Sequence, residues 1–195
     1  YYNEPRLIYT APAFKKGPLK ASNRRTVHIA IDVFANKGTK LYAPMEGEVF
    51  TAEYRDSPLD YGGVVILKHT TPDNDEFFTL YGHLDPQFLD ALQVGDKIDK
   101  GQEFCKLGGP DVNGGWAPHV HFQIAMTTDG MEADWPGVAD PDDLDFWNSV
   151  CPNPASMLNL EEHDCVYNFY KKTEVLSARE KYFGGNLSVS YNDPI

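Results

Sequence analysis

The stretch GVVILKHTTPDNDEFFTLYGH, residues 63–83, decides the fold class, because it holds two runs typical of β-strands. Gly63 to His69 and Glu76 to Tyr81 are rich in β-branched and aromatic side chains, which pack well on a pleated sheet. Pro and Asp residues stand between the two runs and favour a turn over a continuous element. We therefore expect two strands joined by a short connection.

Similar runs lie on both sides of this stretch. They cover Val27–Val33, Gly47–Tyr54, Gln102–Leu107 and His119–Met126. Turn residues separate them at 36–38, 60–63, 94–97 and 113–115. This spacing favours a mainly β fold, an antiparallel sandwich or partly open barrel, over a βαβ repeat.

Length and composition limit the class of protein. The chain has 195 residues, 42% of them hydrophobic and 13% aromatic, which suffices for one ordinary core and argues against disorder. No apolar run approaches the roughly 20 residues that span a bilayer. We expect a soluble globular domain without membrane insertion.

Charge is concentrated in one part of the chain. Residues 1–106 carry 15 acidic and 13 basic residues, whereas residues 107–170 carry 11 acidic residues and no Lys or Arg. An acidic surface repels nucleic acid and anionic lipid, so both are excluded as expected partners. The acidic run at 140–145 predicts a solvated loop and helix start rather than a calcium site, because the EF-hand spacing and its Gly are absent.

The ends and the cysteines bear on context. The chain starts without Met or a signal segment, so we expect a piece of a longer protein. Its three cysteines, Cys105, Cys151 and Cys165, form no C-x-x-C pair. They are expected as reduced thiols, with Cys105 in the core, and favour a cytoplasmic location.

Five residues have the chemistry of a catalytic zinc site: His28, Asp32, His83, His119 and His121. They provide three ligands and two spare imidazoles. In the H-x-H pair both rings leave one face of a strand, with Cα atoms about 7 Å apart. In the H-x-x-x-D pair a regular strand would separate the Cα atoms by about 13 Å, so we expect the backbone to bend near Ala30 if both bind one ion.

The chain resembles the lysostaphin/LytM family of zinc metalloendopeptidases over about 100 residues. The motifs that carry the resemblance, in family order, are His28–Asp32, Gly38–Pro44 with Gly47–Val49, Tyr61–Ile66, Leu80–Leu84, Val94–Ile98 with Lys100–Gln102, and Pro118–Phe122. Two positions depart from the family pattern. Ala30 stands where Gly is usual, and Gln123 stands where Glu commonly follows His-x-His-Phe.

The resemblance implies a role for each of the five residues. His28, Asp32 and His121 are expected to bind one Zn²⁺, while His83 and His119 are expected to assist catalysis. The implied reaction is metal-assisted hydrolysis of a peptide substrate, with glycine-containing or cell-wall peptides usual in the family. On its own, His83 would more often be a polar residue at a strand end.

The organisation expected from the sequence is a lead-in at 1–26, a zinc metallopeptidase-like domain at 27–126 and an acidic extension at 127–195. Helices are expected at Pro154–Leu160 and Tyr167–Tyr182, with Trp135, Phe146 and Trp147 as anchors. Residues 177–183 and 186–194 resemble the start of class III pyridoxal-phosphate aminotransferases. This resemblance implies an adjacent aminotransferase domain in the parent chain.

Some residues keep two interpretations. His69 and His163 match no motif and are expected at the surface or in caps, and Trp116 can line a substrate groove or only pack a turn. Two functions also remain open. One is an active zinc peptidase or amidase, and the other is a metal-retaining domain that serves as a binding or docking module.

Overall fold

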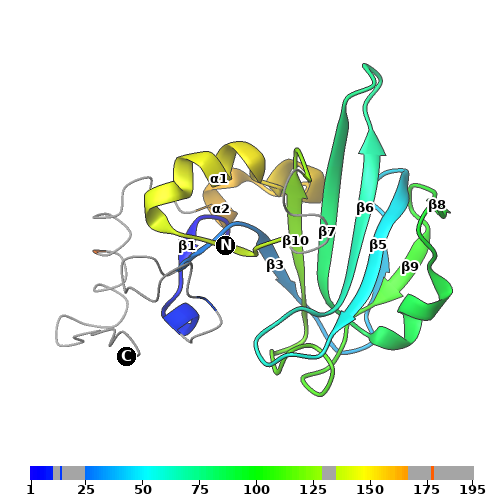
Figure 1. Ribbon diagram of the computed structural model, residues 1–195, viewed down its shortest axis with the longest axis horizontal. Coiled ribbons are helices and arrows are strands. Elements are labelled where there is room, and N and C mark those ends of the chain that lie inside the picture. Colours follow the sequence, from blue (N-terminus) through cyan, green and yellow to red (C-terminus); the bar gives the residue numbers. More distant parts are fainter. Residues whose placement is uncertain (11–13, 15–24, 129–134, 167–176, 178–195) are drawn as a thin grey trace.

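A six-stranded antiparallel sheet forms the centre of the computed structural model, which describes residues 1–10, 14, 25–128, 135–166 and 177. Its order is β3-β10-β7-β6-β5-β8 (Figure 1). The strands are β3 (Ile31–Phe34), β5 (Gly47–Arg55), β6 (Gly62–Thr70), β7 (Glu76–Leu84), β8 (Lys97–Ile98) and β10 (His119–Ala125). A two-stranded sheet pairs β4 (Lys40–Tyr42) with β9 (Glu103–Lys106). The expected mainly β, antiparallel fold is confirmed.

The hairpin of β6 and β7 is largely buried. Alternate side chains of β6 enter two different cores: Val64 and Ile66 join one, Val65 and Leu67 the other. Both faces of the sheet are therefore covered, which explains why this strand is apolar at consecutive positions rather than at every second one.

The first core lies between the large sheet and a layer of short helices (Figure 1). This layer contains η5 (Pro141–Asp143), α1 (Leu144–Val150), η6 (Ala155–Leu158) and α2 (Glu162–Cys165). Asp140 caps η5 by accepting from the Asp142 amide at 2.9 Å, as expected for a helix start in the acidic run. Trp135 is buried and Trp147 packs against the core, but Phe146 is 61% exposed, so its expected role as an anchor is wrong.

The second core lies on the opposite face of the sheet, under β4, β9 and η4 (Pro86–Ala91). Cys105 belongs to it, as expected. All three cysteines are buried free thiols.

The expected strand from Val27 to Val33 is divided in two. Val27–His28 forms β2, which lies between β1 (Glu4–Pro5) and β11 (Val138–Ala139) in a separate three-stranded sheet. Ile29 and Ala30 leave the ladder, and β3 joins the large sheet at Ile31. The bend expected near Ala30 is confirmed. Ile29 and Ala30, the two residues of the bend, are completely buried. On the N-terminal side, η1 (Leu7–Thr10) follows β1.

Other expectations meet different outcomes. His69 is buried rather than at the surface, because its Nδ1 donates to the Glu46 carbonyl at 2.7 Å and its Nε2 lies 2.7 Å from Thr79 Oγ1. His163 is exposed, as expected. Within 154–160 the helix is a short 3₁₀ turn. The helix expected at 167–182 and the aminotransferase-like tail lie, except for residue 177, outside the described residues.

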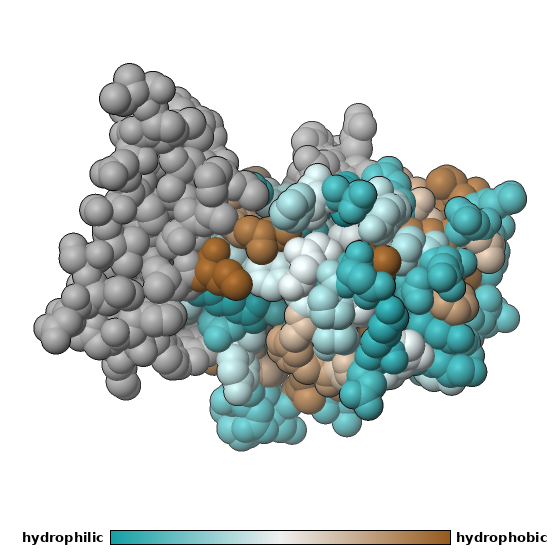
Figure 2. Space-filling view, turned by 90° about the horizontal axis from the view of Figure 1, so that it is seen from below, coloured by the Kyte–Doolittle hydropathy of each residue, from teal (hydrophilic) through white to brown (hydrophobic). Residues whose placement is uncertain are grey.

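Among the coloured residues on the face shown in Figure 2, hydrophilic ones are widespread and apolar ones form smaller groups. Among the described residues, no helix is long and apolar enough to cross a membrane.

Candidate metal and catalytic site

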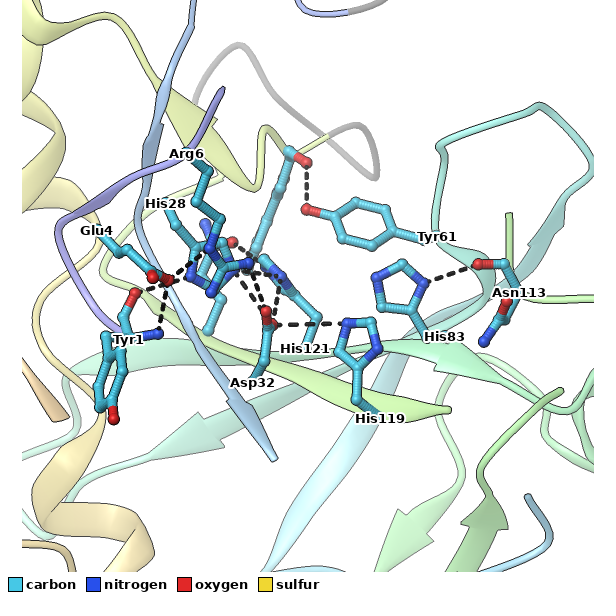
Figure 3. Close-up of polar contacts among 12 residues, drawn as sticks. Tyr1, Glu4, Arg6, His28, Asp32, Tyr61, His83, Asn113, His119 and His121 are labelled. Atoms are coloured by element: carbon cyan, nitrogen blue, oxygen red, sulfur yellow. Dashed lines mark hydrogen bonds and ion pairs between the residues drawn. The ribbon is translucent and has the colours of Figure 1, made fainter. Parts of the chain in front are cut away.

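The five residues singled out in the sequence meet at one end of the large sheet (Figure 3). His119 and His121 lie on β10, His83 on β7, Asp32 on β3 and His28 at the end of β2. The register places His121 opposite Asp32 on one side and Gly82, the neighbour of His83, on the other. Antiparallel pairing thus brings four of the five together, and the bend at Ala30 brings in the fifth.

Three atoms of this group form a triangle. His28 Nε2 lies 3.0 Å from His121 Nδ1 and 3.2 Å from Asp32 Oδ1, and the remaining side, from His121 Nδ1 to Asp32 Oδ1, measures 3.4 Å. Four ligands placed tetrahedrally at zinc bond lengths of about 2.0–2.1 Å stand about 3.3–3.4 Å apart. The triangle is close to one face of such a tetrahedron.

The protons of both rings point away from this triangle. His28 Nδ1 lies 3.0 Å from the Tyr1 carbonyl, which can only accept, so Nδ1 is the donor and Nε2 keeps its lone pair. His121 Nε2 lies 3.0 Å from Gln123 Oε1. The Gln123 amide nitrogen is already turned toward the Pro136 carbonyl and Cys151 Sγ, so Oε1 accepts from His121. His121 Nδ1 is therefore also unprotonated.

The carboxylate completes the set. Asp32 Oδ1 is buried and has no hydrogen-bond donor, because the ring nitrogens that face it carry no proton. Three lone pairs that converge in a buried site without a donor repel one another unless a cation lies between them. Within the described part of the chain, His28, Asp32 and His121 are the one group with metal-ligand geometry, and their chemistry fits Zn²⁺.

The other two imidazoles stand beside the triangle. His83 Nδ1 donates to the Asn113 carbonyl at 3.0 Å and His119 Nδ1 donates to the Ala117 carbonyl at 2.6 Å, which leaves both Nε2 atoms available for proton transfer. The two ring centroids lie 4.3 Å apart. His83 has a φ of 66°, a backbone conformation that non-glycine residues rarely adopt and that is often found at functional sites.

Burial keeps His28, His83 and His119 neutral. Loss of solvent lowers the pKa of His28 to about 3, against the opposing effect of the Asp32 charge. Burial likewise lowers the pKa of His83 and of His119. Burial alone would raise the pKa of Asp32, but the adjacent His28 and His121 bring it below the usual range. At neutral pH the site therefore combines the Asp32 carboxylate with a neutral His28 ring, and carboxylate and neutral imidazole are the protonation states that bind a metal.

A cavity of about 560 Å³ opens over these residues, a volume in the range of small-ligand and peptide pockets. Its lining includes Asp32, His83, His119 and His121. The aromatic residues on its walls are Tyr9, Phe14, Phe34, Tyr61, Trp116 and Trp135. Trp116 lines the cavity and also packs against the small cluster of Tyr9, Phe14 and Val138, and its contact with a substrate stays a prediction.

Sequence reasoning missed two residues of this site. Arg6 donates to Asp32 Oδ2 at 2.6 Å, and nothing in its local sequence distinguishes it from a surface arginine. Tyr61 is buried between His83 and His121, with its hydroxyl donating to the Trp135 carbonyl at 3.2 Å. Gly137 packs so closely on Tyr61 and His121 that a Cβ there would lie 2.6 Å from the tyrosine hydroxyl. The tyrosine stands in the Tyr61-Gly62-Gly63 motif, which was the available signal.

Residues 26–133 match the model of Peptidase family M23. Among solved structures, the catalytic domain of the antimicrobial peptidase lysostaphin from Staphylococcus simulans is 23% identical with a TM-score of 0.47, covering 76% of this chain and 90% of that domain. The catalytic domain of the prophage-encoded M23 protein EnpA from Enterococcus faecalis is 24% identical with a TM-score of 0.43, covering 66% and 85%. No curated protein sequence matches significantly.

Proposed function

Because this chain belongs to peptidase family M23, we propose that it is a zinc-dependent peptidase or amidase, in which His28, Asp32 and His121 hold the ion. The observation that carries the proposal is the buried triangle of three unprotonated atoms with free lone pairs, which lie 3.0–3.4 Å from one another. A bound zinc ion would supply Lewis acidity and activate water at neutral pH.

The chain's own residues then have separate tasks. Because its Nδ1 proton is held by a carbonyl, His119 presents Nε2 to the cavity and can take a proton from the attacking water. His83 presents an unprotonated Nε2 in the same way, so it can accept a proton, and only the protonated ring can donate a hydrogen bond from Nε2 to the oxygen on which negative charge develops. The ring that has taken up the proton of the attacking water can return it to the leaving amine.

The substrate is proposed as a peptide, glycine-containing or of the cell-wall type. Support comes from the family and from the cavity, in which aromatic walls surround the paired imidazoles. The location of the protein is proposed as cytoplasmic, in a longer chain that carries an aminotransferase domain; this rests on the sequence features alone.

Zinc content and cleavage test the proposal together. Protein purified without added metal should contain about one zinc per chain. His28→Ala and Asp32→Ala should lose it, whereas His119→Ala and His83→Asn should retain it. Asn is chosen at position 83 because it tolerates the positive φ of this residue. The exposed His163→Ala serves as the control for removal of an imidazole.

A digest of glycine-rich and wall-derived peptide libraries provides the second readout. Wild type and His163→Ala should cleave, while His119→Ala and His83→Asn should be slower by about 10²–10⁴-fold with zinc still bound. Retention of zinc in all the ligand variants would refute the metal assignment. A zinc-loaded wild type that cleaves no peptide would instead favour the docking module.

A further inference from the structure

The N-terminal segment Tyr1–Arg6 lies against the ligand side of the site, although it is outside the family match at 26–133 (Figure 3). It is held there by β1, in which Glu4 pairs with His28 and Pro5 with Val27. The segment therefore approaches the two ligands that come from the bent part of the chain.

One side chain of this segment reaches Asp32. The Arg6 guanidinium donates from Nη1 to Asp32 Oδ2 at 2.6 Å and to the Tyr9 hydroxyl at 3.1 Å, and from Nε to Glu4 Oε2 at 2.5 Å. The side chains are largely buried, with 19% of Arg6 and 3% of Asp32 exposed. Three oxygens thus fix the orientation of the guanidinium, and a charge-assisted hydrogen bond of this kind is strong where water is excluded.

This contact makes the two oxygens of Asp32 different. Oδ2 is engaged by Arg6, whereas Oδ1 has no hydrogen-bond donor and faces His28 Nε2 and His121 Nδ1. Without Arg6, the carboxylate could rotate about its terminal bond or present both oxygens to a cation.

We propose that Arg6 is a positioning residue of the metal site, which holds Asp32 so that one oxygen alone is available to the ion. The inference rests on the zinc site of the proposed function. It extends the site beyond the family match, because the same segment also orients His28 through the Tyr1 carbonyl. Partners of metal ligands commonly set ligand orientation in this way, and their loss typically costs about 10–100-fold in metal affinity.

A purely structural role for Arg6 makes different predictions. If Arg6 only balanced the charge of the buried Asp32 carboxylate, it would stabilise the folded protein. Its removal would then leave zinc affinity and zinc coordination unchanged. Arg6→Lys retains the charge and loses the planar fork, whereas Arg6→Met removes both. Arg55 lines the same cavity from β5 and pairs with Glu53, so Arg55→Met is the matched control.

The test measures zinc affinity by competition with a chelator, together with the visible spectrum of the Co²⁺-substituted proteins. We expect Arg6→Met to bind zinc about 10–100-fold more weakly than wild type, Arg6→Lys to lie between them and Arg55→Met to equal wild type. The Co²⁺ absorption bands of Arg6→Met should weaken, because coordination by both oxygens of Asp32 raises the coordination number. Should Arg6→Met fail to fold, Glu4→Gln, which loosens the guanidinium, should show a smaller change in the same direction.

Several outcomes would overturn the inference. Unchanged zinc affinity and Co²⁺ spectra in folded Arg6 variants would leave the guanidinium a structural role and the proposed function intact. A rise in zinc affinity would show that it acts by repelling the ion. A wild type that binds no zinc would remove the proposed function itself.

Discussion

The two halves of the metal site are built in contrasting ways. On β10, His119 and His121 share one face of a regular strand that is hydrogen-bonded on both sides within the large sheet. On the other half, His28 and Asp32 belong to different sheets and meet because the chain bends at Ile29 and Ala30. One half depends on the period of a strand, and the other depends on how two sheets are joined. The regular geometry of β10 thus suffices to place His119 and His121 on one face, whereas the bend between His28 and Asp32 has to be held by contacts with other segments.

Removal of a ligand from either half should have the largest effect. His28→Ala and His121→Ala should both lose zinc affinity by more than the about 10–100-fold expected for an outer partner, since two ligands rarely retain the ion. Metal analysis and chelator competition check this. If His28→Ala kept its zinc, the bent half would not belong to the site, and the contrast between the two halves would not hold.

Gln123 supports the β10 half, and its loss should have the next largest effect. Gln123→Met removes the acceptor for His121 Nε2, so we expect zinc affinity to fall about 10–100-fold. Gln123→Glu keeps an acceptor at this position and should lose less. Equal affinity of wild type and Gln123→Met would show that the strand alone orients His121.

The bent half should also make the metal-free protein sensitive to acid. Burial lowers the pKa of His28 to about 3 from an ordinary value of 6.5. Between pH 6.5 and pH 3, His28 therefore binds a proton in the unfolded chain but not in the folded chain. The stabilising effect of the neutral ring is therefore complete above pH 6.5 and is lost as the pH falls toward 3, by up to about 1.4 kcal/mol per pH unit. Urea unfolding of the apoprotein at pH 7.5 and pH 5 measures it. His28→Gln should reduce this pH dependence, and an unchanged dependence would contradict the assignment.

A substitution at the bend should have the smallest effect. Ala30→Gly should lower the free energy of unfolding by about 0.4–1 kcal/mol, because the unfolded chain gains freedom. Zinc affinity should remain that of wild type, since β2 and β3 are each held by pairing with neighbouring strands. The measurements are urea unfolding and chelator competition. A large change in zinc affinity would mean that the conformation of Ala30 itself, rather than the two sheets, holds His28 and Asp32 together.

The strands and the β10 half of the site could be predicted because both follow from local pattern. The runs that became β6, β7 and β10 differ from the observed strands by only a few terminal residues. His69 was misplaced because its burial depends on two hydrogen-bond partners supplied by other segments, Glu46 and Thr79. Phe146 was misplaced for a similar reason, since the side of α1 that faces the core is set by packing.

The sequence by itself determined the class of fold, the five residues proposed to carry the chemistry and the need for a bend near Ala30. These follow from strand periodicity and from the reach of an extended chain, which are local properties. Only the tertiary structure decided that the bend joins two sheets, that His28 and His121 turn their protons outward, and that Arg6 takes one oxygen of Asp32. The orientations of His28 and Asp32 depend on hydrogen bonds from segments distant in the sequence, and Gln123, the partner of His121 on the same strand, is itself oriented by the distant Pro136 and Cys151.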